Sequence, residues 1–310
     1  MPPPGPLKLL PQPIARPWGG RALAERYHKP LPRGEAPLGE SWEASDLPGA
    51  VSRLAEGPLA GTPIDQVLGE PLPVLVKLLD ARQWLSLQVH PDERRAREIG
   101  GGARAKSEAW YVLWAEPGAE IIHGLLPGVD LTALLQGLER GSLEGLVRRV
   151  PVHTGDVVYV PAGTLHAIGP GIVLYEVQQP SDTTYRVYDW GRGRELHLVQ
   201  AARALVLGAP EHAVLPTGLT PGVNPCIPLV RCPAFQLELL LVDRGERVLF
   251  ERAYTTVLTA IAGSGWLLAD SGRSPVRPGE TWVVPAGVDL CLKPGPHGLR
   301  VLRAGPGAKR

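Results

Sequence analysis

Apolar residues along this chain fall mostly into short runs rich in Val, Leu and aromatic side chains, bounded by Gly, Pro and polar residues. Runs of this kind are typical of β-strands. They predict strands in residues 39–44, 72–89, 109–114, 120–122, 156–160, 235–242, 247–250, 255–261, 265–269, 281–284 and 299–303. The chain is therefore expected to be mainly β.

In a few places this pattern is interrupted by segments in which apolar residues recur every three or four positions. Such spacing predicts short helices. The expected helical segments are residues 63–69, 94–99, 131–138, 142–149 and 196–207. Asp130 and Ser142 precede two of them as candidate N-caps. Residues 1–35 are Pro-rich and show little periodicity, so we predict an ordered coil there, with Trp18-Gly19-Gly20 as a turn.

A 16-residue stretch occurs twice. Residues 151–166 read PVHTGDVVYVPAGTLH and residues 275–290 read PVRPGETWVVPAGVDL. Each copy has an acidic Gly turn, an apolar strand and a Pro-Ala-Gly turn, which is typical of small β-barrels. The repeat predicts two barrels, with Leu290 where the first copy has His166. The expected division is a metal-binding domain at 1–209 with a helical insertion at about 127–149, a Pro/Gly-rich linker at 210–228, and a degenerate barrel without metal at 229–310.

Charge and composition limit the partners of the protein. The chain has 32 Lys plus Arg and 31 Asp plus Glu, so its net charge gives no reason to expect nucleic acid or an anionic membrane as a partner. No uncharged run approaches the length of a membrane span, and the N-terminus does not resemble a signal peptide. Three scattered cysteines do not form a disulfide framework. We expect a cytoplasmic protein that is a monomer or a weak homo-oligomer.

Four residues of the first half have metal-ligand chemistry at strand spacing. Gln88 and His90 are two apart and share one face if their segment is a strand, and the same holds for Lys106 and Glu108. His166 follows the turn of the repeat. Imidazole nitrogen, carboxylate oxygen and amide oxygen are suitable ligands for a divalent transition metal. Neighbouring strands of one barrel would bring these side chains together.

The same segments resemble the type I mannose-6-phosphate isomerase family, a zinc-dependent group within the cupin superfamily, and specifically its short bacterial branch. The resemblance covers about two-thirds of the chain. It rests on RPWGG, GESWEAS, LVKLLDARQWLSLQVHPDE, GARAKSEAWYVL and VPAGTLHAIGPGIVLYEVQQPSDTTYRVYDWGR, in that order. It implies two cupin-type barrels (jelly rolls) and the isomerisation of mannose 6-phosphate and fructose 6-phosphate through a cis-enediolate.

The resemblance also assigns roles to individual residues. It implies one Zn²⁺ per chain, held by Gln88, His90, Glu108 and His166. It places the catalytic groups at Arg186, Glu176 and Lys106, and the substrate contacts at Lys77, Ser86, Glu40 and Trp18, with Lys77 and Ser86 toward the phosphate. Either Glu176 or Lys106 is then the base that moves a proton between C2 and C1.

Two other classes of function are compatible with parts of this pattern. A non-catalytic sugar-binding cupin would be expected to lack some of the metal or base positions, yet all are present in the first copy. The second class is a different metal-dependent cupin enzyme, such as an oxygenase or an isomerase of another sugar; a phosphate-free substrate would leave Lys77 and Ser86 without a use. An assay that compares the activity of the protein on mannose 6-phosphate and on mannose distinguishes these hypotheses.

Overall fold

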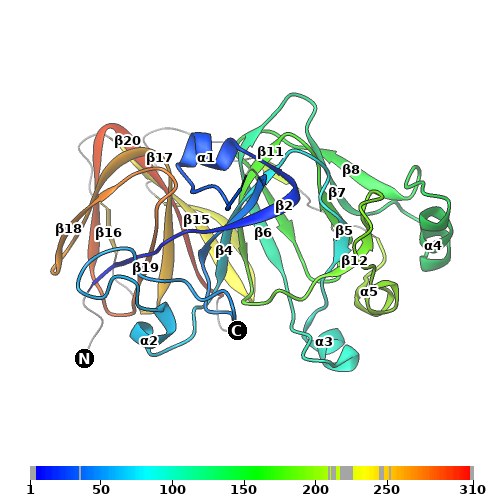
Figure 1. Ribbon diagram of the computed structural model, residues 1–310, viewed down its shortest axis with the longest axis horizontal. Helices are drawn as coiled ribbons and strands as arrows, with labels where there is room; N and C mark the ends of the chain where they lie inside the picture. Colours follow the sequence, from blue (N-terminus) through cyan, green and yellow to red (C-terminus); the bar gives the residue numbers. More distant parts are fainter. Residues whose placement is uncertain are drawn as a thin grey trace. The chain divides into compact units, whose positions relative to one another are not determined.

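The computed structural model describes residues 5–34, 36–208, 210, 214–216, 226–243, 248–250 and 253–307. Over these residues the chain is mainly antiparallel β-structure with short helices, as the sequence predicts (Figure 1). It forms two compact units that alternate along the chain. Unit 1 contains residues 1–16, 21–78 and 218–310, and unit 2 contains residues 17–20 and 79–217.

Unit 2 is built from two antiparallel sheets. One sheet has the strand order β12-β5-β10-β7-β8, and the other includes the neighbours β13-β9-β6-β11. The elements are β5 (Leu87–Val89), α3 (Glu93–Ile99), β6 (Glu108–Ala115), β7 (Glu120–Leu125), α4 (Leu131–Glu139), β8 (Val147–Pro151), β9 (Asp156–Val160), β10 (His166–Ile168), β11 (Ile172–Gln178), β12 (Tyr185–Tyr188), α5 (Leu198–Ala204) and β13 (Val214–Pro216).

The alternation of side chains gives each face of the five-stranded sheet a separate role. Leu87, Val89 and Val187 share a hydrophobic cluster with residues of α4 and α5 on the outer face of the sheet. A second cluster, which includes Trp110, Val158 and Ile168, contains residues of both sheets and forms the interior between them. Gln88 alternates with Leu87 and Val89, so it points into this interior.

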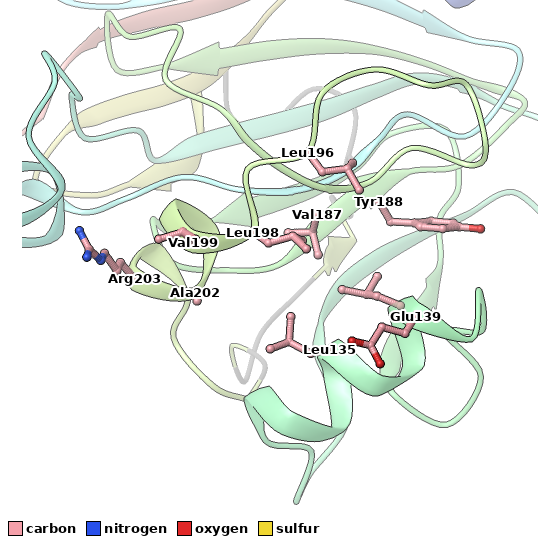
Figure 2. Close-up of a pocket in the computed structure, with 10 residues that line it drawn as sticks. Leu135, Glu139, Val187, Tyr188, Leu196, Leu198, Val199, Ala202 and Arg203 are labelled. Atoms are coloured by element: carbon pink, nitrogen blue, oxygen red, sulfur yellow. The ribbon is translucent and has the colours of Figure 1, made fainter.

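An apolar pocket of about 760 Å³ opens on the outer face of the same sheet. It is formed by α4, β12, α5 and Leu196, with Leu135, Val187 and Leu198 in its walls (Figure 2). None of the predicted metal, catalytic or substrate residues lines it. The pocket is therefore separate from the predicted chemistry.

Unit 1 contains the second barrel. Its main sheet has the order β1-β19-β17-β20-β15-β14, with β16 on β20 and β18 on β17. The elements are β1 (Leu7–Lys8), β2 (Gln12–Gly20), α1 (Ala22–Tyr27), β3 (Leu38–Ala44), α2 (Ile64–Leu68), β4 (Leu75–Ala81), β14 (Cys226–Arg231), β15 (Phe235–Val242), β16 (Val248–Phe250), β17 (Thr256–Ala269), β18 (Gly272–Val276), β19 (Thr281–Val284) and β20 (Leu290–Pro306); β2 and β4 each end in unit 2.

The repeat has the same strand pairing in both units, which allows position-by-position comparison. Glu108 pairs with Val160 on β9, and Thr256 pairs with Val284 at the same place in the second copy. His166 pairs with Gln88, whereas Leu290 pairs with Phe250. The second barrel therefore has Phe250, Thr256 and Leu290 where the first has Gln88, Glu108 and His166.

Two expectations about secondary structure are wrong. Residues 142–149 are not a helix: Val147 begins β8, which pairs with β7, and the Ser142 hydroxyl accepts a local bond from the amide of Glu144. Residues 1–35 are not a coil, because β2 and α1 lie there and Trp18-Gly19-Gly20 ends β2. In both places the strand is completed by a partner outside the segment itself, β7 for β8 and β3 for β2, so local periodicity does not reveal it.

The observed units also differ from the sequential division expected at residues 209 and 229. Residues of the N-terminal segment join the second barrel, for example through the pairing of β1 with β19. The expected linker at 210–228 lies largely outside the described residues, although β13 pairs with β9 and β14 begins at Cys226. Among the described helices none is long and apolar enough to cross a bilayer. The cytoplasmic location stays a prediction.

A buried ion pair joins the N-terminal segment to the second barrel within unit 1. The Lys29 ammonium donates to Glu43 Oε2 at 2.6 Å and to the carbonyl of Gly279. Glu43 also accepts from Ser41 at 2.7 Å and from Thr281 at 3.1 Å. Lys29 and Glu43 are almost fully buried. Removing one charge would leave the other without its counter-ion in a site closed to water.

We therefore expect Glu43→Gln to lower the free energy of unfolding by about 3–5 kcal/mol, because the Lys29 ammonium loses its counter-ion. Urea unfolding at neutral pH measures the effect. The double variant Lys29→Met/Glu43→Gln removes both charges and should recover much of the loss. Equal stability of Glu43→Gln and the parent protein would contradict this role.

Candidate metal centre and active site

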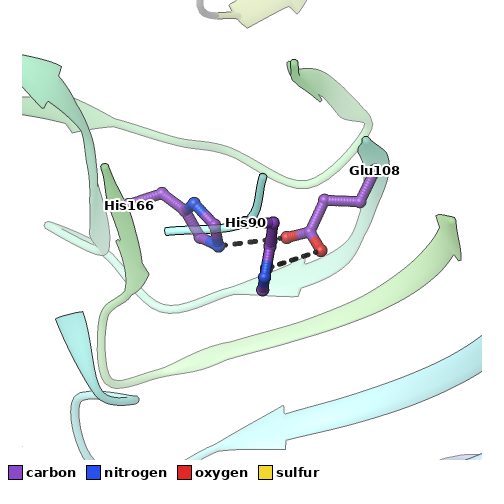
Figure 3. Close-up of side chains that lie close together, drawn as sticks. All are labelled: His90, Glu108 and His166. Carbon is purple, nitrogen blue, oxygen red and sulfur yellow. Dashed lines mark ion pairs between the residues drawn. The ribbon is translucent and has the colours of Figure 1, made fainter. Parts of the chain in front are cut away.

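Three buried side chains from different strands converge between the two sheets of unit 2. His90 follows β5, Glu108 begins β6 and His166 begins β10 (Figure 3). His90 Nε2 lies 3.3 Å from Glu108 Oε2, and His166 Nε2 lies 3.3 Å from Glu108 Oε1. Each of the three is only 1% exposed. The sequence predicted this set from spacing and resemblance, and the structure brings it together.

Backbone carbonyls set the orientation and tautomer of both imidazoles. His90 Nδ1 lies 2.8 Å from the carbonyl oxygen of Thr183, and His166 Nδ1 lies 2.9 Å from that of Thr164. A carbonyl only accepts, so each Nδ1 carries a hydrogen and donates it. In the neutral rings the Nε2 lone pairs therefore face Glu108. Carbonyl-bound imidazoles of this kind are typical of metal-ligating histidines.

The electrostatic environment favours a neutral His90 imidazole and an ionised Glu108 carboxylate. Burial, followed by the Lys106 cation, lowers the pKa of His90 to about 3. Burial alone would raise the pKa of Glu108, but the Lys106 cation beside it holds that pKa well below its usual range. Two imidazole nitrogens and one carboxylate match the donor chemistry of a divalent transition-metal site. The residues present therefore fit a bound metal ion.

Gln88 and Lys106 lie beside the three central residues. The Gln88 amide lies 3.3 Å from His166 Nε2, and its other end accepts from the Ser86 hydroxyl at 3.3 Å. The two amide orientations are distinguished only by such bonds, and the opposite one turns the amide oxygen toward His166 Nε2. Lys106 Nζ lies 2.6 Å from Glu108 Oε2 and 3.2 Å from His90 Nε2.

Strand register places Glu176 and Arg186 near the same interior. Glu176 on β11 pairs with Trp110 on β6, two residues from Glu108 and on its face. Arg186 on β12 pairs directly with Gln88 on β5. Glu176 is 4% exposed. The Arg186 guanidinium donates to the carbonyl of Glu195 at 2.7 Å. Their catalytic roles stay predictions.

The structure adds contacts that the sequence analysis missed. The Trp110 indole donates to Glu108 Oε1 at 3.1 Å, and its ring lies edge-on to His166 with 5.7 Å between centroids. Trp110 is two residues after Glu108 on the same strand face, so alternation could have indicated it. The accepting carbonyls of Thr164 and Thr183 leave no signal in the sequence, because every residue has a carbonyl.

The remaining predicted substrate residues fall in two places. In unit 1, Glu40 binds Arg16 at 2.8 Å and the Trp42 indole at 2.7 Å, and Lys77 Nζ lies 4.7 Å from the centroid of the Trp42 ring. Burial by itself would raise the pKa of Glu40, but Lys77 and Arg16 lower it to about 2. Trp18 is 3% exposed within the interior hydrophobic cluster of unit 2. Substrate binding by these residues stays a prediction.

Two antiparallel sheets that enclose a buried His-Glu-His set define a cupin-type protein with a candidate metal centre. Residues 7–113 match the family model "Phosphomannose isomerase type I, catalytic domain". The chain is 35% identical to mannose-6-phosphate isomerase of Streptococcus mutans, over 90% of this chain and 92% of the relative. It is 33% identical to mannose-6-phosphate isomerase ManA of Bacillus subtilis, over 87% and 90%.

Solved structures agree with these sequence relatives. A crystal structure of mannose 6-phosphate isomerase from Bacillus subtilis matches with a TM-score of 0.85 and 30% identity, covering 97% of this chain and 99% of the other. A variant of phosphomannose isomerase from Salmonella typhimurium matches at 16% identity with a TM-score of 0.78, covering 98% and 100%, and shares the fold. The chain belongs to the type I mannose-6-phosphate isomerase family.

We expect His166→Ala to lower metal affinity by more than about 100-fold, because losing a ligand should cost at least as much as losing a residue that supports one. Elemental analysis after dialysis and the rise in melting temperature on adding Zn²⁺ measure the loss. His153→Ala is the matched control, since the His153 side chain is 82% exposed. Retention of stoichiometric metal by His166→Ala would refute the ligand assignment.

Glu40 should make stability depend on acidic pH. Its folded-state pKa of about 2 lies below the ordinary 4.5, so its stabilising contribution is complete above pH 4.5 and is lost as the pH falls toward 2. The shift corresponds to about 3 kcal/mol at most. Urea unfolding should show Glu40→Gln less stable than the parent at pH 7, with the difference shrinking by pH 3. A pH-independent difference would contradict this, and the exposed Glu25→Gln should show none.

Proposed function

We propose that this protein interconverts D-mannose 6-phosphate and D-fructose 6-phosphate, as a zinc-dependent aldose-ketose isomerase. One observation carries the proposal: a buried His90-Glu108-His166 set with Lys106 against it, in a chain 35% identical to a mannose-6-phosphate isomerase over nearly its full length. The His-Glu-His set is the reason to propose a metal-dependent enzyme. The names of the relatives are the reason to propose mannose 6-phosphate as the substrate. One Zn²⁺ per chain is expected, since Thr256 and Leu290 replace two of the ligands in the second barrel.

The reaction moves a proton between two adjacent carbons. A base removes the proton at C2 of the aldose, a cis-enediolate forms, and the proton returns at C1 to give the ketose. A zinc ion held by His90, Glu108 and His166, with Gln88 as the fourth ligand, would supply Lewis acidity for the sugar oxygens. The protein's own groups must then bind the substrate, move the proton and stabilise negative charge.

The geometry favours Glu176 over Lys106 as the base. The Lys106 ammonium lies 2.6 Å from Glu108 Oε2, an arrangement that keeps its proton and leaves no lone pair for a carbon acid. Glu176 is a buried carboxylate on the interior face of β11, and β11 pairs directly with β6, the strand that bears Glu108. Glu176 would carry the proton, and Lys106 would keep Glu108 ionised. Lys77 and Ser86 are retained as the expected contacts of the phosphate.

Purified protein of known zinc content tests the proposal directly. Mannose 6-phosphate and unphosphorylated mannose are assayed side by side for ketose formation. We expect isomerisation of the phosphate ester and little of the free sugar. Reaction in D₂O should place deuterium at C1 or C2 when a base exchanges its proton with solvent during transfer. Zinc-loaded protein that acts on mannose but not on its 6-phosphate would overturn the assignment.

Arg186→Lys should lower kcat about 100-fold with little change in KM, because a fixed cation matters most when charge develops on the substrate oxygens. Lysine keeps the charge but loses the planar fork and its reach. Steady-state kinetics with mannose 6-phosphate measure the split, and zinc content should equal that of the parent protein. A raised KM with unchanged kcat would assign Arg186 to substrate binding instead.

A further inference from the structure

The loop between β12 and α5, residues 189–197, turns back onto the strand that bears Arg186. The Arg186 amide donates to His197 Nδ1 at 3.1 Å, and the His197 amide donates to the Arg186 carbonyl at 2.8 Å. The Arg186 guanidinium donates to the carbonyl of Glu195 at 2.7 Å. Both the backbone and the side chain of Arg186 are therefore fixed by the far end of this loop.

The start of the loop has an unfavourable backbone conformation. Trp190 has φ = 54°, and Gly191 and Gly193 have φ values of 76° and 74°. Glycine adopts this left-handed region freely, but a bulky residue does so only when its surroundings require it. Trp190 donates from its indole to the carbonyl of Leu85 at 2.6 Å, and its ring contacts those of Trp84 and Tyr188. These contacts compensate for the backbone strain.

Asp189 is the centre of the loop's polar contacts. Its carboxylate is 4% exposed and accepts from Arg192 Nη2 at 2.9 Å and from Arg194 Nε at 2.8 Å. Burial alone would raise the pKa of Asp189, but the hydrogen bonds from Arg194 and Arg192 lower it. Arg194 directly precedes Glu195, whose carbonyl binds Arg186. Arg192 also donates to the carbonyl of Trp84 at 2.7 Å.

The loop thus connects two parts of the candidate active site. Through Trp84 and Leu85 it contacts the segment that leads into β5, the strand of the predicted ligand Gln88. Through Glu195 and His197 it holds Arg186, which pairs with Gln88 in register. We propose that Asp189, acting through Arg194 and Arg192, is a positioning residue that fixes the Arg186 guanidinium at the reacting end of the substrate.

The proposal rests on the proposed isomerase function, because it assumes that Arg186 acts during the reaction. A cation held in place before the reaction need not reorganise when charge develops, and a misplacement of about 1 Å costs about 100-fold in rate. Asp189 has no assigned contact with substrate or metal. Its loss should therefore reduce kcat through Arg186 and leave KM and zinc content nearly unchanged.

The experiment is a double-mutant cycle on zinc-loaded protein with Asp189→Asn and Arg186→Lys. Asparagine keeps the size of the side chain but presents an N–H toward the two guanidinium groups. We expect Asp189→Asn to lower kcat by about 10- to 100-fold in the parent background. In the Arg186→Lys background the same change should lower kcat by less than about 3-fold, because coupled residues are not additive.

Equal losses of kcat in both backgrounds would overturn the proposal and leave Asp189 a merely structural residue. If Asp189→Asn does not fold, Arg194→Gln breaks the same connection at a side chain that is 29% exposed. It should show the same loss and the same coupling, and normal kcat in soluble Arg194→Gln would also overturn the proposal. Arg82→Gln, which removes an exposed ion pair with Glu116, is the control and should have no effect.

Failure of the proposed function has a different signature. Zinc-loaded parent protein without isomerase activity would refute both ideas together. Active parent protein with additive Asp189 and Arg186 losses would refute only the positioning role. The melting temperature of each variant, measured in parallel, identifies any loss of kcat that comes from partial unfolding.

Discussion

The structure of unit 2 depends on keeping one ionised carboxylate, that of Glu108, away from water. A buried charge of this kind is costly unless other groups compensate for it. Lys106, Trp110, His90 and His166 all contact the Glu108 carboxylate, and they come from the segment before β6, from β6, from the residue after β5 and from β10. Both sheets must therefore be in register before the charge is compensated. The same condition assembles the metal donors, so folding and site formation are linked.

The second barrel shows what the same turn pattern does without that requirement. Its repeat keeps the Pro-Ala-Gly turn, but Leu290 and Trp282 lie in an apolar cluster, and Thr256 stands at the Glu108 position. An apolar interior of this kind contains few polar groups that need hydrogen-bond partners. One buried ion pair of unit 1 lies elsewhere, at Lys29 and Glu43. The two barrels thus share the turn pattern and strand pairing of the repeat. They differ in their interiors, because the first encloses the His-Glu-His set and the second has an apolar cluster there.

The five-stranded sheet of unit 2 uses its two faces for separate purposes. Residues at alternate positions of β5 and β12 pack against α4 and α5, whereas Gln88 and Arg186 lie between them in sequence and pair with each other. The apolar pocket at α4 and α5 is on the packing face. Because side chains of β5 alternate between the two faces, a shift of one residue in the register of this strand would exchange core and site residues.

The sequence by itself determined the β class and the repeat, and it predicted a His90-Glu108-His166 set that the structure brings together, because side-chain alternation and short motifs act over a few neighbouring residues. It did not determine that β8 begins at Val147 or that residues 12–20 form β2, since apolar spacing alone does not show which strand is the partner. Tertiary structure alone decided the tautomers of His90 and His166 and the contacts of Asp189. Those features depend on carbonyls and guanidinium groups brought together by folding, and such contacts leave no periodic signal in the chain.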